Sequence, residues 1–254
     1  MIFSNLITSF LQLIFKPKVW VPLLAMLIIS LAMTQFMSVV LEGPMSDIIL
    51  YPDTFPSENI MSVFLTQYPV EILVAIAAAF LMTVLGVIAF NSITRIVQGS
   101  GLISSINESM IESRKAFGIA IVFWGAFLFA LFCLTIIGVI TGISDIIGLI
   151  LFILFAIIIF VVIVKTIFVL PALNDNEIKP AFIKSWKFTQ KRFWKATLYI
   201  FLAGLVSLII GSVIYSAGLF FAGSIIELII LAIGETFTSL YFIVAITNYF
   251  YSKQ

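Results

Sequence analysis

The chain has 254 residues, of which 63% are hydrophobic, 15% aromatic and only 10% charged, and its formal net charge is +1. Soluble domains average about 45–50% apolar and about 25% charged residues, so a water-soluble globule could not bury this much apolar surface. With 14 Gly, 8 Pro and one Cys, the composition also excludes collagen-like, disordered and disulfide-rich classes. The sequence therefore predicts an all-α integral membrane protein.

Six apolar stretches are long enough to cross a bilayer, which takes about 20 residues. The last two stretches are separated at Gly218 and Gly223, where a tight hairpin needs flexible backbone. Between the first two stretches, residues 42–67 form a predicted outer loop that contains acidic residues and no basic one. We predict a single membrane domain over residues 1–254, with spans at Val19–Leu41, Val70–Ile93, Phe117–Ile140, Ile146–Leu170, Ala196–Ala217 and Ser224–Phe250.

The basic residues give the orientation. With six spans, all 13 Lys and Arg residues fall on one side of the membrane, and any odd number of spans would spoil this partition. The positive-inside rule makes that side cytoplasmic. We therefore expect a multi-pass protein of the cell membrane with both termini in the cytoplasm.

Three cytoplasmic segments have the pattern of helices that lie in the membrane interface. The first covers residues 1–16 and ends in the Lys16-Pro17-Lys18 elbow, and the others are Leu102–Lys115 and Pro180–Lys195. The alternative is that all three are plain connectors that obey the positive-inside rule. In the third segment, Trp and cationic side chains suit contact with lipid headgroups. The candidate headgroup contacts are Lys184, Trp186, Lys187, Lys191, Arg192 and Trp194.

The residues that most enzymes and metal sites use are missing. There is no histidine, which excludes His-based acid–base catalysis and His metal ligation. The lone Cys133 has no histidine to activate its thiol, and no Gly-rich phosphate loop occurs. We expect a protein that is not an enzyme and has no catalytic, cofactor-binding or metal-ligating residue.

Two carboxyl groups in the last predicted span are candidates for an intramembrane function. Glu235 is predicted near the middle of this span and Glu227 two turns further outward. A carboxyl in the hydrocarbon core is costly, which makes it a functional candidate. The alternative is a neutral Glu235 that bonds to Ser207 or Thr83 at similar depth.

Rows of small residues predict which spans pack closely, because small side chains let membrane helices approach. Ala203, Ser207 and Gly211 form such a row in the fifth span. Ala75, Ala79 and Thr83 form another in the second span. Proline is absent from the span interiors, which weighs against the broken helices common in secondary transporters.

The fourth-to-fifth connection resembles a known pattern. It is that of the membrane domain fused to some glycerophosphodiester phosphodiesterases, and of the free-standing relatives of that domain. The resemblance implies a six-span fold and a membrane location but no activity, because the phosphodiesterase catalytic histidines have no counterpart here. Lys191 departs from the pattern, which often has glycine before Arg-Phe-Trp. The matching residues are Val169-Leu170-Pro171-Ala172, Glu177, Ala181-Phe182-Ile183-Lys184-Ser185-Trp186, Thr189 and Arg192-Phe193-Trp194.

Three functions remain open at this point. The first is a non-enzymatic module that binds membrane lipids or organises other membrane proteins. The second is a permease-like subunit that works with a separate cytoplasmic ATPase. The third is a channel or carrier that uses Glu235. Membrane lipids are the expected partners, with another membrane protein or an ATPase as further candidates and nucleic acid excluded.

Overall fold

The computed structural model describes residues 2–50, 66–221 and 225–253. It is about 91% helical, and no strand occurs in these ranges. In chain order the helices are α1 (Ile2–Phe15), the 3-10 turn η1 (Pro17–Val19), α2 (Trp20–Leu50), α4 (Pro69–Val97), α5 (Leu102–Ile111), α6 (Ser113–Ile143), α7 (Asp145–Thr166), α8 (Val169–Leu173), α9 (Ile178–Gln190), α10 (Phe193–Leu219) and α11 (Ile225–Tyr251).

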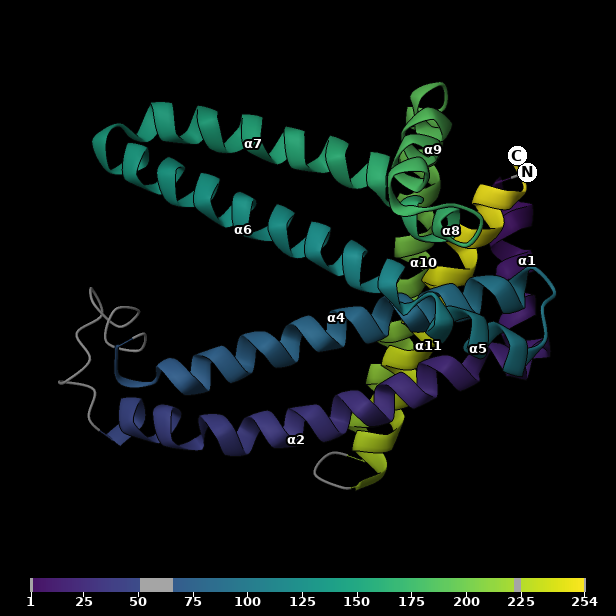
Figure 1. Cartoon of the computed structure of the whole chain (residues 1–254), viewed down its shortest axis with the longest axis horizontal. Helices are drawn as coiled ribbons and strands as arrows, with labels where there is room; N and C mark the ends of the chain where they lie inside the picture. Colours follow the sequence, from purple (N-terminus) through teal and green to yellow (C-terminus); the bar gives the residue numbers. More distant parts are fainter. Residues whose placement is uncertain (1, 51–65, 222–224, 254) are drawn as a thin grey trace.

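The long helices form hairpins that diverge from a common end (Figure 1). The α2–α4 pair and the α6–α7 pair extend to the left of Figure 1, and the α10–α11 pair runs downward. The short helices α1, α5, α8 and α9 lie where the hairpins meet, next to both marked ends of the chain. We call this region the base.

The predicted number of membrane-length helices is confirmed for the described residues. Six helices there are long and apolar enough to cross a membrane. The helices extend beyond the predicted spans: α6 begins at Ser113 and α10 begins at Phe193. Helix α2 continues to Leu50, although its apolar span ends at Val40, one residue before the predicted end. Most of the predicted outer loop (51–65) and the predicted start of the last span at Ser224 lie outside the described residues.

The fourth span is interrupted near its end, although its apolar stretch continues to Leu173. Helix α7 stops at Thr166, and Pro171 lies within the separate short helix α8. Proline has no N–H to donate, and its ring clashes with the carbonyl group four residues back, here that of Ile167. The chain therefore breaks before Pro171, and this break turns it from the span into the base.

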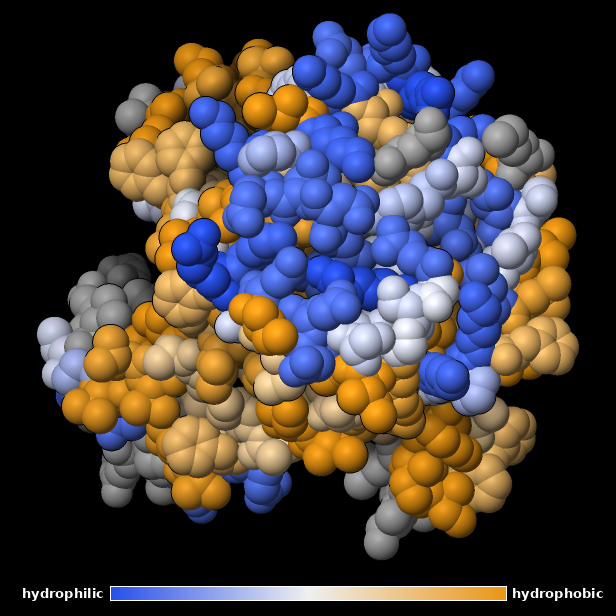
Figure 2. Space-filling model, turned by 45° about the vertical axis from the view of Figure 1, so that its right-hand side comes forward, coloured by the Kyte–Doolittle hydropathy of each residue, from blue (hydrophilic) through white to orange (hydrophobic). Residues whose placement is uncertain are grey.

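The buried core of the molecule lies at the base. Residues of α6, α8, α10 and α11 are fully buried there, whereas the far halves of the hairpins are largely exposed. Ile119, near the start of α6, is 0% exposed, and Ile153 in α7 is 49% exposed. Figure 2 shows hydrophilic residues gathered over the base and apolar residues on its flanks. The three hairpins are thus held together by their packing against one another and against the short helices at the base.

Helix α1 lies along the second half of α11. The Asn248 amide donates to Ser9 Oγ and to Gln12 Oε1, at 2.9 Å each. The Asn5 amide donates to Ser252 Oγ at 2.8 Å. At the turn into α2, the Trp20 indole N–H donates to the carbonyl oxygen of Leu13 at 2.9 Å. These bonds fix α1 and the turn after Lys16 against the base.

The small residues of the fifth span pack against α11. Ala203 is fully buried, and the Ser207 hydroxyl donates to the carbonyl oxygen of Thr238 at 3.2 Å. A Cβ atom added at Gly211 would lie 3.2 Å from Thr238 Cγ2. The same close approach involves Gly234 on α11, where an added Cβ would lie 2.7 Å from Ile214 Cγ2.

Candidate cationic groove at the base

Helix α9 packs through a row of small residues and exposes its lysines. Ala181, Ser185 and Thr189 recur every four residues and are buried. The Ser185 hydroxyl donates to the carbonyl oxygen of Lys165 at 2.6 Å, which ties α9 to the end of α7. Because one helical face is used for packing, the lysines at other positions of α9 face outward.

A groove of about 660 Å³ lies between α9 and the end of α11. Five of its ten lining residues are cationic, and none is acidic. The nearest acidic partner in the described chain is Asp175, whose Oδ2 lies 3.9 Å from Lys184 Nζ. We call this feature the cationic groove. Its lining residues are Asn176, Pro180, Ile183, Lys184, Lys187, Phe188, Lys191, Arg192, Phe250 and Lys253.

Aromatic rings form the apolar part of the groove wall. The Phe188 and Phe250 ring centroids are 5.0 Å apart, and both rings contact the buried Phe168. Lys184 Nζ lies 5.5 Å from the Phe250 ring centre, and the Arg192 guanidinium lies 5.8 Å from that of Phe188. The groove therefore combines cations with an apolar surface, as amphiphilic ligands require.

Arg192, just before α10, connects one side of the groove to the residues that follow α11. One guanidinium nitrogen of Arg192 donates to the carbonyl oxygen of Lys253 at 3.1 Å. The sequence does not predict a role for Lys253 or Phe250. Nothing in the local sequence pairs the end of α11 with α9, because the contact depends on how the third hairpin returns to the base.

Four of the six predicted headgroup contacts line the cationic groove: Lys184, Lys187, Lys191 and Arg192. The two tryptophans lie outside it. Trp186 is 47% exposed and covers Lys165, whose Nζ lies 4.1 Å from the ring centre. Trp194 is 78% exposed in the first turn of α10.

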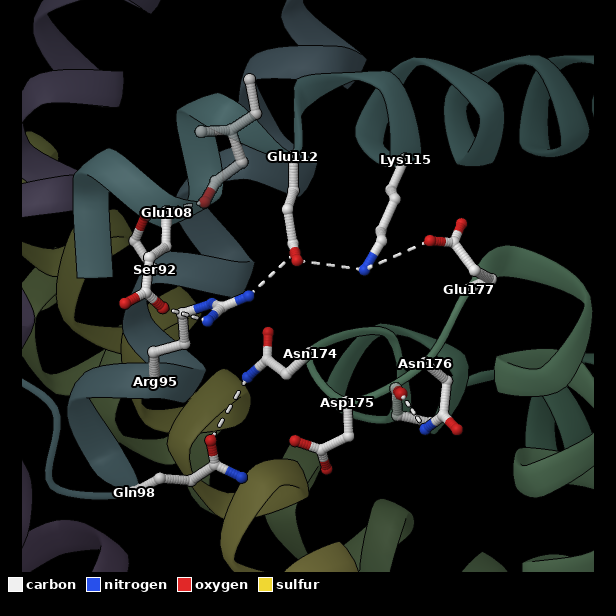
Figure 3. A network of polar contacts seen from close by, with 12 residues as sticks. Ser92, Arg95, Gln98, Glu108, Glu112, Lys115, Asn174, Asp175, Asn176 and Glu177 are labelled. Atoms are coloured by element: carbon white, nitrogen blue, oxygen red, sulfur yellow. Dashed lines mark hydrogen bonds and ion pairs between the residues drawn. The ribbon is translucent and has the colours of Figure 1, made fainter. Parts of the chain in front are cut away.

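A charged cluster holds the loop that leads into α9 (Figure 3). Arg95, at the end of α4, forms ion pairs with Glu108 and, at 2.8 Å, with Glu112. Glu112 also lies 3.1 Å from Lys115, which in turn lies 3.9 Å from Glu177 at the start of α9. The chain of contacts therefore joins α4, α5, α6 and α9. We call it the base clamp.

Neighbouring residues of the same loop bond to α4 and α11. The Asn174 amide donates to Gln98 Oε1 at 3.5 Å. The Tyr251 hydroxyl donates to the carbonyl oxygen of Pro171 at 2.8 Å and lies 3.2 Å from Asp175 Oδ2. The loop between α8 and α9 is thus fixed from two sides, and this positions the groove wall.

The structure places the two candidate carboxyl groups on α11, far from the groove. Glu227 lies in the first turn of α11, where the helix dipole stabilises a negative charge. Glu235 is exposed and lines a small notch of about 180 Å³ with Tyr215 and Thr238. It lies six residues, about 9 Å, from the start of the span at Ile229.

The hydroxyl groups considered as partners of Glu235 bond elsewhere. The Ser207 hydroxyl donates to the carbonyl oxygen of Thr238. Thr83 donates to the carbonyl oxygen of Ala79 and accepts the Trp124 indole N–H at 3.0 Å. In the described part of the chain, neither hydroxyl reaches the Glu235 side chain.

Within the described residues, no group of three or more His, Cys, Asp or Glu side chains is placed to hold a metal ion. Cys133 is a free thiol on α6. No protein-family model, curated protein or solved structure matches the chain. The geometry of the cationic groove is therefore the basis for a functional proposal.

Proposed function

We propose that the chain is a non-enzymatic multi-pass protein of the cell membrane whose base lies on the cytoplasmic side and binds anionic lipid. One observation carries the proposal: five cationic side chains line one groove that has no acidic lining residue, those of Lys184, Lys187, Lys191, Arg192 and Lys253. The cytoplasmic leaflet is negatively charged, and each Lys or Arg near it contributes about 1 kcal/mol of attraction.

The exposed apolar faces of the short helices support the same arrangement. In α1, Phe3, Ile7 and Phe15 are exposed, and in α5, Ile103 and Ile111 are exposed. An amphipathic helix with such a face lies stably at the boundary of headgroups and acyl chains. We propose that α1, α5 and α9 lie in this interface.

Lipid preference in nanodiscs tests the proposal. Spin-labelled phosphatidylglycerol should be immobilised by the protein more strongly than spin-labelled phosphatidylcholine. Charge reversal at Lys184, Lys187 and Lys191 together should remove most of this preference. An unchanged preference in the triple variant, or no preference in the parent protein, would overturn the proposal.

A second candidate function is proton or cation passage that uses Glu235. The observation that favours it is a hydroxyl-rich groove of about 620 Å³ on α10 and α11. This groove shares Tyr215 and Thr238 with the notch at Glu235. In proteoliposomes, Glu235→Gln should abolish a proton flux that the parent protein shows. Equal flux in both proteins would assign Glu235 a structural role.

A further inference from the structure

The cationic groove holds more positive charge than a singly charged lipid can balance. Lys187 and Lys191 form no ion pair within the described chain, and Lys184 shares only the 3.9 Å contact to Asp175. A phosphodiester such as phosphatidylglycerol brings one negative charge. A ligand with at least two phosphate groups matches the groove better, because basic pockets beside membrane helices favour multiply charged headgroups.

Three of the groove cations follow one another along α9 and its C-terminal end. Lys184, Lys187 and Lys191 are spaced three and four residues apart, which puts them on one face from α9 to its C-terminal end. From the first to the last the helix rises about 10 Å. A single phosphate would leave most of these charges without an anion. Two phosphates joined by a short linker can each contact different ammonium groups along the row.

The apolar wall indicates that the phosphates belong to a lipid. Phe188 and Phe250 face the groove together with Ile183 and Pro180. A free polyphosphate gains nothing from these side chains. The glycerol and first acyl carbons of a lipid can cover them and remove apolar surface from water.

We propose that the cationic groove binds a lipid headgroup that carries two phosphate groups. The inference rests on the proposed function and adds a ligand class and a defined site to it. The proposal differs from general attraction between a basic surface and an anionic membrane, because it specifies one site that prefers one class of lipid.

Titration of the full chain in mild detergent, followed by native mass spectrometry, tests this claim. The probes are cardiolipin, which has two linked phosphates, and phosphatidylglycerol at the same phosphate concentration. Cardiolipin should bind at one site at least about tenfold more tightly than phosphatidylglycerol. The double variant Lys187→Gln/Lys191→Gln should lose about tenfold or more in cardiolipin affinity.

A matched control removes the same charge from the same connection. Lys179 and Lys195 are exposed and do not line the groove, so Lys179→Gln/Lys195→Gln should keep its cardiolipin affinity within about twofold, because exposed charges without direct contact contribute little. Equal losses in the two double variants would overturn the inference. Equal affinities for cardiolipin and phosphatidylglycerol would overturn it too.

Inorganic pyrophosphate separates a lipid from a soluble ligand. If pyrophosphate displaces cardiolipin at comparable phosphate concentrations, the groove binds free polyphosphate and the lipid assignment is wrong. The nanodisc experiment distinguishes the two proposals. A preference for phosphatidylglycerol over phosphatidylcholine without a gain for cardiolipin would leave the proposed function standing and remove only the two-phosphate site.

Discussion

Arg95 is the residue through which several segments of the base are joined. Its side chain is 13% exposed and contacts Glu108 and Glu112. Removing the guanidinium leaves the carboxylates of Glu108 and Glu112 without the cation that both contact. Since Glu108 and Glu112 are themselves partly exposed, water compensates part of that loss.

We expect Arg95→Gln to lower the free energy of unfolding by about 1–3 kcal/mol. The measurement is unfolding by SDS titration of the detergent-solubilised protein. Arg114→Gln is the control, because Arg114 is exposed and forms no ion pair in the described chain. If both variants unfold at the same SDS fraction, the base clamp contributes nothing to stability.

The sequence alone predicted some residues of the cationic groove and missed others. The lysines of α9 were predicted as headgroup contacts from composition and helical spacing alone. Phe250 and Lys253 were not, because they come from the end of α11 and the residues after it, about 60 residues further along the chain. Helical periodicity predicts which side chains face outward. Which side chains of different helices lie next to one another depends on tertiary packing, which the local sequence does not show.

At the scale of helices, the α10–α11 pair depends on close backbone approach. Gly234→Ala places a methyl group 2.7 Å from Ile214 Cγ2, so the Ile214 side chain or one of the two helices must shift. We expect a loss of about 1–3 kcal/mol in unfolding free energy, measured by the same SDS titration.

Gly204 on α10 is the matched control. A Cβ atom there meets nothing within 4 Å, so Gly204→Ala should be neutral or should stabilise the helix by up to about 1 kcal/mol. A larger loss for Gly204→Ala than for Gly234→Ala would contradict the packing described for the hairpin.

Helix limits were predicted less well than helix number. The fourth span was predicted as one continuous helix to Leu170, whereas α7 ends at Thr166 and the apolar span continues through α8 to Leu173. The predicted third interfacial segment, Pro180–Lys195, is divided between α9 and the first turn of α10. The bilayer-length apolar runs determine how many helices form, but capping, proline and tertiary contacts determine where each one ends.

For the whole molecule, the structure concentrates packing at the base. We expect Ile119→Ala to cost about 2–4 kcal/mol in unfolding free energy, because it opens a cavity among fully buried side chains. Ile153→Ala removes an exposed group of α7 and should cost less than about 1 kcal/mol. Similar losses for the two variants in SDS titration would show that the far halves of the hairpins pack as tightly as the base.

The proposed orientation predicts which positions water-soluble reagents reach. In a background with Cys133→Ser, single cysteines at Ser100 and Gln190 lie at the exposed base. They should resist a membrane-impermeant maleimide in intact cells and react after permeabilisation. A cysteine at Gln67, before α4, should react in intact cells. The reverse pattern would invert the orientation and remove the base from the cytoplasmic leaflet.

The most direct test of anionic-lipid binding is the composition of what accompanies the protein from its native membrane. The parent chain and the Lys184, Lys187 and Lys191 charge-reversal variant are purified in mild detergent, and their lipids and proteins are identified by mass spectrometry. We expect anionic lipid enriched over the bulk membrane with the parent chain and close to bulk with the variant. Bulk-like lipid in both, together with a stoichiometric ATPase, would contradict the account and identify a transporter subunit.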